Sequence, residues 1–238
     1  MDSLATIDVA MDGDVLVATI DRAGSDLNAV DDQLHADLAA FFAALKRERG
    51  PRATLLTGSK RAFSAGGDFA WFPTLRSMER LDHLRRDAKQ MIWDLLDVEM
   101  PIVAGLNGPA VGLGASIALL CDVVVMAESA VIADPHVRVG IVAGDGGAAI
   151  WPLLIGPLLA KRYLLTGDPV TAAEAERLGL VTEVAPAARR SAHAIARAAL
   201  LDSFDLSTAL ELPLFLTQDH EEAMAALREG RPPHFEGR

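Results

Sequence analysis

Residues 101–122 read PIVAGLNGPAVGLGASIALLCD, and the interpretation of the whole chain starts from them. The apolar segment 102–106 predicts a buried strand, and residues 115–120 predict a buried helix that ends near Asp122. Between them, the glycine-rich turn 107–114 lets the backbone bend sharply and approach a ligand closely. The unpaired amides at the start of such a helix suit an oxygen that becomes negatively charged. A plain tight turn into a core helix explains the same residues equally well.

The composition is that of a globular chain without a basic surface. Of its 238 residues, 51% are hydrophobic and 23% are charged, which suits one sizeable core and not a disordered chain. A net charge of -11 without a Lys/Arg block argues against nucleic acid or an anionic membrane as a partner. We expect Cys121, the single cysteine, in the core of a protein from a reducing compartment. No signal peptide opens the chain, and no apolar run reaches about 18 residues unbroken, so we expect a cytoplasmic protein.

Strand and helix patterns alternate over residues 1–185. Asp12-Gly13 between two alternating segments predicts a hairpin, and Gly50-Pro51 ends the first helix. The expected strands are 5–10, 15–20, 53–57, 102–106, 123–127, 131–133 and 180–184. The expected helices are 31–49, 78–97, 115–120, 148–154, 158–165 and one that starts at a capping box of Thr171 and Glu174. Residues 186–238 become Ala-rich and helical, so we expect an α/β core over 1–185 followed by a helical C-terminal region.

Several segments together resemble the enoyl-CoA hydratase/isomerase, or crotonase, superfamily. They are FSAGGD at 63–68, NGPAVGLGASIALLCD at 107–122, GDGG at 144–147, LNA at 27–29, TGDPVTAAEAERLGLV at 166–181 and the terminal RPPHFEGR. The resemblance covers nearly the whole chain in the right order. It implies an α/β fold with a spiral of ββα repeats and a helical C-terminal oligomerisation region, assembled as a homotrimer or hexamer. It also implies an acyl-CoA substrate in fatty acid metabolism, with coenzyme A as part of the substrate and no other cofactor.

The resemblance assigns an oxyanion hole to the backbone amides of Ala65 and Leu113. These amides would bind the thioester carbonyl and stabilise an enolate, and Gly66, Gly112 and Gly114 would allow the close approach. Further residues are implied near the substrate: Leu27, Arg61, Ala62 and Phe63 at the nucleotide end of coenzyme A, and Phe69 at the acyl part. Asp68 either approaches the substrate or caps the turn that follows it.

The acid–base side chains depart from the hydratase pattern. Hydratases hold water between two glutamates, and this chain has Ser116 and His136 at the matching positions. Serine is not a base without one beside it, so the water clamp is absent. We expect His136 to replace the glutamate, with Asp145 orienting its ring and raising its pKa. Asp145 is equally explained as the N-cap of the next helix, and His136 as a loop or core histidine.

The other polar and aromatic residues have structural interpretations. No group of His, Cys, Asp and Glu has a recognisable metal spacing. Trp151 is expected in the core, Trp71 and Phe72 in the core or an acyl pocket, and Asp122 at the helix–strand junction. Glu128, Asp134 and the remaining histidines are expected in solvent.

Three functions remain open from the sequence. The first is an enoyl-CoA hydratase/isomerase-like lyase or isomerase in which His136 takes the place of the usual glutamate. The second is a hydrolase that splits a carbon–carbon bond of a β-diketone with the His136/Asp145 pair and without coenzyme A. The third is a catalytically inactive acyl-CoA binder.

Overall fold

The computed structural model describes residues 4–196 and positions 218, 222, 225, 226, 229, 231, 232 and 234. By contacts, the chain divides into two compact units, Met1–Arg197 and Ala198–Arg238. All the named helices and strands belong to the first unit. The helices expected after residue 196, and His220, lie outside the described residues.

A six-stranded sheet forms the centre of the first unit, in the order β1-β2-β3-β4-β6-β9. The predicted hairpin is confirmed: β1 (Ile7–Asp12) pairs antiparallel with β2 (Val15–Ile20) across Asp12-Gly13. The other strands are parallel: β3 (Ala53–Gly58), β4 (Ile102–Leu106), β6 (Val123–Ala127) and β9 (Glu183–Ala185). Every residue of β3 and β4 is buried, as expected for central parallel strands covered on both faces.

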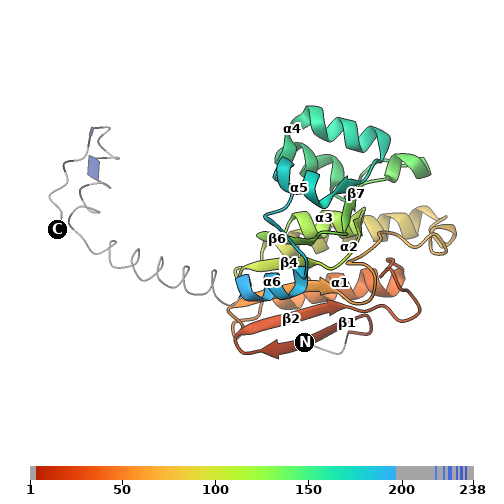
Figure 1. Cartoon of the computed structure of the whole chain (residues 1–238), viewed down its shortest axis with the longest axis horizontal. Coiled ribbons are helices and arrows are strands. Elements are labelled where there is room, and N and C mark those ends of the chain that lie inside the picture. The colour runs from red at the N-terminus through yellow and green to blue at the C-terminus, as the bar shows by residue number, and fades with distance from the viewer. Residues whose placement is uncertain are drawn as a thin grey trace. The chain divides into compact units, whose positions relative to one another are not determined.

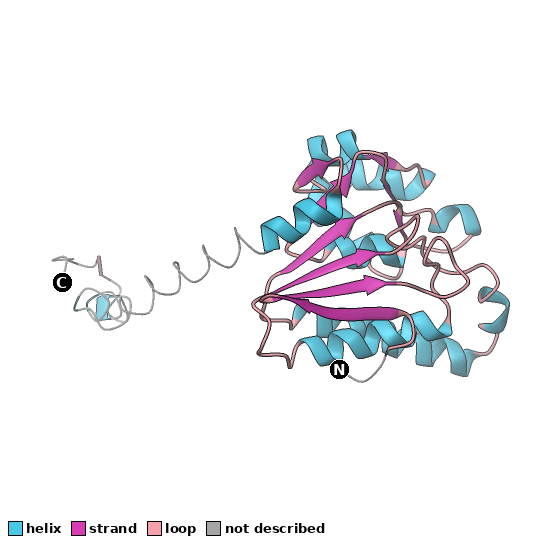
Figure 2. Ribbon diagram, turned by 60° about the horizontal axis from the view of Figure 1, so that its bottom comes forward, coloured by secondary structure: helices cyan, strands magenta, loops and turns pink. Residues whose placement is uncertain are grey.

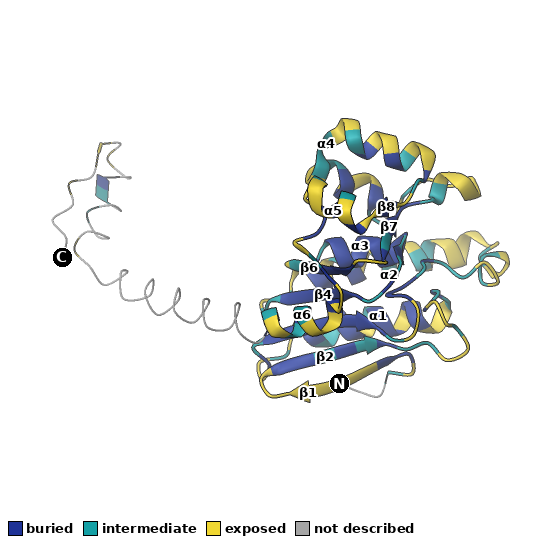
Figure 3. Cartoon of the chain, viewed as in Figure 1, coloured by how far each residue is buried: buried dark blue, intermediate teal, exposed yellow. Residues whose placement is uncertain are grey.

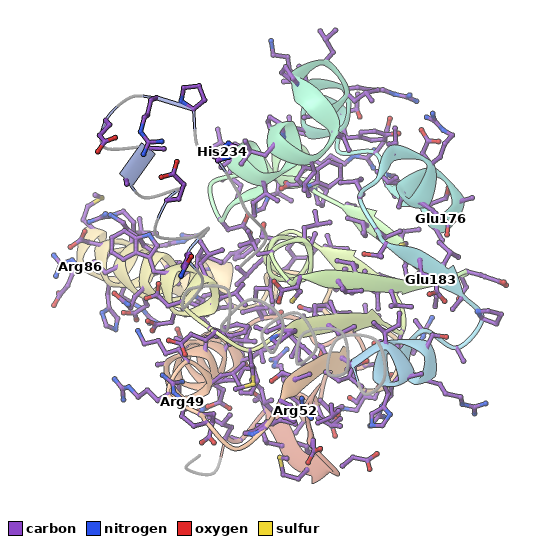
Figure 4. All side chains as sticks on the ribbon, turned by 90° about the vertical axis from the view of Figure 1, so that its left-hand side faces the viewer. Arg49, Arg52, Arg86, Glu176, Glu183 and His234 are labelled. Atoms are coloured by element: carbon purple, nitrogen blue, oxygen red, sulfur yellow. The ribbon has the colours of Figure 1, made fainter. Side chains whose placement is uncertain are left out.

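Helices cover both faces of this sheet (Figures 1 and 2). On one face lie α1 (Asp32–Leu45) and α2 (Met78–Leu96), which also pack on each other; α6 (Ala188–Ala194) lies on the other face. Asp31 and Ser77 cap α1 and α2 by accepting from backbone amides three residues on. Figure 4 shows Arg86 on the outer side of α2, so the polar face of that helix meets solvent.

A second, three-stranded sheet stands beside the first, in the order β5-β7-β8. Its strands are β5 (Ala110–Val111), β7 (Val131–Ala133) and β8 (Val170–Thr171). Around them lie α3 (Leu113–Leu119), α4 (Gly147–Thr166), α5 (Ala172–Leu178) and two 3-10 turns, η1 (Phe72–Thr74) and η2 (His136–Val139). Because β5 leads directly into α3, the long-range pairing of β5 with β7 positions the start of that helix.

Local patterns placed most elements, and the differences have physical causes. The α1 helix ends at Leu45 rather than at residue 49, because the amides of Arg47 and Glu48 close tight turns instead of helical ones. The short strand β5 was expected to be turn, since its pairing partner is distant in sequence. The two helices expected at 148–154 and 158–165 are joined as α4 across a non-helical Gly156 with φ of 76°. The last strand begins at Glu183, three residues later than expected.

Several structural interpretations are confirmed. Trp151 and Cys121 are buried in the core. Asp122, at the junction between α3 and β6, accepts the Ile102 amide through Oδ2 at 2.7 Å and so joins this junction to the start of β4. Thr171 caps α5 by accepting from the Glu174 amide at 3.4 Å.

The α4 helix is apolar and largely exposed. By length and composition it is the one described helix that could cross a membrane, and 22% of the relevant window is buried. Pro152, Pro157 and the non-helical Gly156 interrupt it, as the sequence indicated. Figure 3 shows the exposed face of α4 in contrast to the buried strands of the main sheet.

Candidate active site

A pocket of about 290 Å³ opens between α1, α2, the start of α3 and the loop before α4. Among the residues that line it are His136, Asp145, Gly67 and Leu113, which we take as its polar end. The remaining wall is mostly apolar and aromatic: Val30, His35, Trp71, Phe72, Leu81, Leu84, Arg85, Ala88 and Gly144. An apolar pocket with a few convergent polar groups is the usual form of a small-molecule site.

Two glycine-rich segments, 63–68 and 107–114, run side by side at the polar end of this pocket. Ser64 bridges to Ala110, and the Val111 amide donates to the Ser64 carbonyl at 2.9 Å. The approach is close: a Cβ on Gly66 would lie 2.8 Å from the Val111 carbonyl oxygen, and one on Gly114 would lie 2.6 Å from that of Ser64. Glycine at both positions is therefore required for this contact.

The free amide of the first segment belongs to Gly67 and not to Ala65. The prediction for Ala65 is wrong, because its amide donates to the Leu27 carbonyl at 2.9 Å. Gly67 lies opposite Val30. The Val30 amide donates to the Gly66 carbonyl, and the Val30 carbonyl accepts from the Asp68 amide, so neither group of Val30 bonds the Gly67 amide. Among the described residues, no acceptor is bonded to the amide of Gly67, which lines the pocket.

The free amide of the second segment belongs to Leu113. Leu113 is the first residue of α3, and in the described part of the chain its amide has no hydrogen-bond acceptor. Gly112 precedes it with φ of 53°, a conformation that favours glycine. A Cβ on Gly112 would lie 3.4 Å from His136 Cε1 and 3.7 Å from Asp145 Oδ2. The start of α3 thus touches the side chains that could move a proton.

His136 lies between two carboxylates. Its Nδ1 is 2.5 Å from Asp134 Oδ1, and its Nε2 is 3.3 Å from Asp145 Oδ2. Asp145 Oδ1 in turn accepts from the buried Ser116 hydroxyl at 3.4 Å. The structure therefore brings together His136, Asp145 and Ser116, all three predicted from the sequence.

Asp134 corrects the expectation that it is solvated: its side chain is 1% exposed, and it binds His136. Asp145 is not a helix cap, because α4 is capped by Gly146 without a side-chain hydrogen bond. The contact with Asp134 first, and then the one with Asp145, raises the pKa of His136 to about 10, against the opposing effect of burial. The cluster therefore carries a proton on His136 at neutral pH.

The same three side chains are close enough to surround a metal ion, since their ligand atoms lie within 4.8 Å of one another. A metal would need a lone pair on an imidazole nitrogen. Both ring nitrogens instead face carboxylate oxygens. This arrangement favours proton transfer over metal binding.

One residue of the pocket wall, His35, differs from the expectation from sequence. His35 was expected on the surface, but it is 6% exposed, and burial lowers its pKa, so the ring is neutral. Its ring lies 6.1 Å from that of Trp71, whose Nε1 donates to Asp32 Oδ1 at 2.8 Å. Trp71 and Phe72 line the pocket, in agreement with one of their two expected roles.

The structure places the other predicted residues outside this pocket. Asp68 holds its own turn by accepting from the Ala70 amide at 2.9 Å and from Arg22 at 2.7 Å, which is its expected capping role. Phe69 is 73% exposed and packs edge-on against Phe72. Ala62 and Phe63 are fully buried, whereas Leu27 and Arg61 lie on the exposed loops beside them. Coenzyme A contacts of these residues stay predictions.

Sequence reasoning missed Gly67, Asp134 and His35 as parts of the site. Gly67 lies inside a segment already singled out, two positions from Ala65, and Asp134 lies two positions before His136. Backbone pairing distinguishes Gly67 from Ala65, and burial distinguishes Asp134 from a solvated carboxylate. Neither property is visible in a local sequence pattern. His35 lies on the apolar face of α1, where its spacing with Leu34 and Leu38 indicated burial.

Comparison with known proteins places the chain in a family. Residues 11–211 match the family model described as enoyl-CoA hydratase/isomerase. The chain is 32% identical to the 2,3-dehydroadipyl-CoA hydratase of Escherichia coli, over 94% of this chain and 96% of the relative. An enoyl-CoA hydratase/isomerase from Mycobacterium paratuberculosis superposes with a TM-score of 0.79 at 39% identity, covering 97% of this chain and 88% of that one. Pseudomonas aeruginosa DspI superposes with a TM-score of 0.78 at 28% identity, covering 99% and 98%.

These matches span nearly the whole chain. The predicted fold class, α/β with a spiral of ββα repeats, is confirmed by the structural neighbours, and α6 is the described helix of the C-terminal region. The chain belongs to the enoyl-CoA hydratase/isomerase family, the crotonase superfamily.

Proposed function

We propose that this protein moves a proton at the α-carbon of an acyl-CoA thioester. The amides of Gly67 and Leu113 bind the thioester oxygen, and His136 and Asp145 carry the proton. The observation that carries the proposal is the meeting of two free amides with a His–Asp pair at one end of an otherwise apolar pocket. Family membership supports the thioester as substrate.

The two amides suit an enolate because they need no reorganisation when negative charge develops on the oxygen. One such donor contributes about 10²–10³ in turnover in other enzymes. Both lie on segments held rigidly by backbone pairing, at Ser64–Ala110 and at Val30–Gly67. A side-chain donor would be freer to move than these backbone groups.

The acid–base groups favour double-bond migration over hydration. Hydration needs a positioned water as well as a proton carrier, and family hydratases are expected to hold it between two carboxylates. Here Ser116 replaces one of these, and Asp134 is buried behind the His136 ring. Asp145 is the one carboxylate of the cluster that lines the pocket. Enoyl-CoA hydratase activity, which the relatives' names indicate, is the second reaction to assay.

Leu113→Pro tests the oxyanion amide directly. Proline is tolerated at the first position of a helix, where its missing N–H has no helical partner. Leu113→Ala is the matched control, because it removes the side chain and keeps the amide. We expect Leu113→Pro to lower kcat by about 10²–10³ relative to Leu113→Ala at similar melting temperature. Equal kcat values in the two folded variants would refute the role of this amide.

A substrate panel separates the remaining functions. The His136–Asp145 contact of 3.3 Å also suits the hydrolysis of a β-diketone, so the panel includes a cyclic 1,3-diketone without coenzyme A. A second cavity of about 360 Å³ adjoins the first at Asp145 and is lined by Arg85 and Lys89. Because these cations suit a distal carboxylate, the panel includes 2,3-dehydroadipyl-CoA beside monocarboxylic enoyl-CoA esters. Binding without turnover of any of them would indicate an inactive acyl-CoA binder.

The quaternary state and location stay predictions. We propose a homotrimer or hexamer in the cytoplasm, with coenzyme A supplied by the substrate and no separate cofactor. The exposed side chains of Leu153, Leu158 and Leu165 on α4, each more than two-thirds exposed, support burial of that helix against another copy. Sedimentation equilibrium measures the mass of the assembly directly.

A further inference from the structure

Asp134 is a buried carboxylate that does not line the pocket, yet it makes the shortest contact of the cluster, 2.5 Å to His136 Nδ1. We propose that Asp134 is a positioning residue that keeps the His136 ring doubly protonated in the resting enzyme, so that His136 donates a proton to the substrate and Asp145 accepts one. The chemical step rests on the proposed function. The protonation state of the ring does not.

The geometry supports a doubly protonated ring. A neutral imidazole has one N–H donor and one lone pair. Both ring nitrogens of His136 face carboxylate oxygens, at 2.5 Å for Asp134 and 3.3 Å for Asp145. In a neutral ring, one of these contacts would set a lone pair against an oxygen. An imidazolium donates a charge-assisted hydrogen bond to Asp134 and forms an ion pair with Asp145.

The start of α4 lies beside Asp134 and favours its negative charge. Its Oδ2 is buried and has no hydrogen-bond partner among the described residues. This oxygen lies against Gly147, the first residue of α4, where a Cβ would come within 1.8 Å of it. The start of a helix carries partial positive charge, which favours a carboxylate there. Glycine at position 147 leaves the space that this oxygen occupies.

Other charged groups near the ring do not replace Asp134. Arg138 follows His136 on η2, but its guanidinium binds Asp168 at 2.6 Å and the Thr166 carbonyl at 2.9 Å. Across the pocket, α1 presents the neutral His35 and α2 presents Arg85. Within the described chain, Asp134 and Asp145 are therefore the anionic groups in contact with the ring, and of these two the contact with Asp134 raises the pKa of His136 more.

This state assigns opposite roles to the two pocket residues. Asp145 removes the α-proton of a β,γ-unsaturated thioester, and the electron pair of the C–H bond enters the enolate at the two amides. The proton on His136 Nε2 is then delivered to the γ-carbon, whose new C–H bond uses the enolate electron pair. The proton on Asp145 passes to Nε2 and restores both groups. Double-bond migration is complete without any co-reactant.

Nitrogen-15 NMR of histidine-labelled protein tests the resting state without substrate. His136→Gln identifies the ring signals, and the wild type is compared with Asp134→Asn, which keeps an oxygen acceptor and removes the charge. We expect both ring nitrogens to be protonated in the wild type until the pH approaches about 10. In Asp134→Asn we expect the midpoint to fall by about 1–3 pH units. A singly protonated wild-type ring at neutral pH, or an unchanged midpoint in the variant, would overturn the proposal.

The pH dependence of turnover separates this role from a merely structural one. In Asp134→Asn, the His136 ring loses its second proton at a lower pH than in the wild type. The variant's kcat/KM should therefore fall at alkaline pH and stay closer to the wild-type value at acid pH. An equal loss at every pH would show that Asp134 acts only on structure. If no thioester is turned over, the proposed function fails, and the NMR titration still decides the state of the ring. Should Asp134→Asn not fold, the NMR measurement of the wild-type His136 ring alone tests the proposed doubly protonated state.

Discussion

The raised pKa of His136 makes the stability of the fold depend on alkaline pH. The pKa is 6.5 in an ordinary histidine and rises to about 10 in the folded protein. Below about pH 6.5 the ring is protonated in both the folded and unfolded chains, and its stabilising contribution is complete. As the pH rises from there through about 10, the unfolded ring loses its proton first and the contribution is lost. A difference of about 3.5 between the two pKa values corresponds to a free energy on the order of 5 kcal/mol.

Urea unfolding across this pH range measures the effect. Lysine, tyrosine and cysteine side chains also titrate at alkaline pH, so we compare the free energy of unfolding of the wild type with that of His136→Gln at each pH. The difference between the two should shrink from neutral pH to about 10 by several kcal/mol. His83→Gln is the control, because His83 is 79% exposed on α2. A difference between wild type and His136→Gln that stays constant over the range would refute the charged state of the ring.

Four further predictions follow from particular contacts. Asp145→Asn should lower turnover by about 10²–10⁴ at a temperature where the variant stays folded; loss of a helix cap is not a cause, since no side chain caps α4. Gly147→Ala should lower the free energy of unfolding by about 1–3 kcal/mol, because its Cβ would lie 1.8 Å from Asp134 Oδ2; Gly144→Ala, with its nearest neighbour at 3.8 Å, should not. His35→Leu should raise stability to urea by about 1 kcal/mol, because the Nε2 of His35 is buried without a partner in the described chain. Leu158→Glu should lower the mass measured by sedimentation if α4 contacts another copy, since Leu158 is 83% exposed in one chain.

The accuracy of the sequence reasoning varied with the range of the interactions involved. The hairpin, α2 and strands β4 and β6 lie where the patterns placed them, because alternation, helical spacing and turn residues act over a few positions. The two-residue strand β5 was missed because its existence depends on pairing with β7, which begins 20 residues later. Likewise, burial of His35 required α1 to pack against α2.

Within the site, motif spacing was sufficient for Leu113, His136 and Asp145 but not for their partners. The structure begins α3 at Leu113, two residues before the expected start, so its amide has no partner within the helix. The state of the Ala65 and Gly67 amides depends on which residues of the 27–30 loop pair with the segment, and the structure engages Ala65 with Leu27. Asp134 is adjacent to a strand end, where solvent and burial are equally compatible with the local sequence.

By itself, the amino-acid sequence determined the α/β class, because hydrophobic periodicity and turn residues are local properties. The resemblance of several segments to a known family indicated the family and the segments that carry the chemistry. Only the tertiary structure decided which amide of the first segment remains free and which carboxylate faces the ring of His136. An N–H group bonds well only to an acceptor that lies nearly in line with it. A buried charge needs a charged or polar neighbour within a few ångströms. The first condition is set by the pairing of the 27–30 loop with residues 65–68, and the second by the packing of β7, η2 and the start of α4. Each joins residues that are distant in the sequence or depends on burial, so no local stretch contains it.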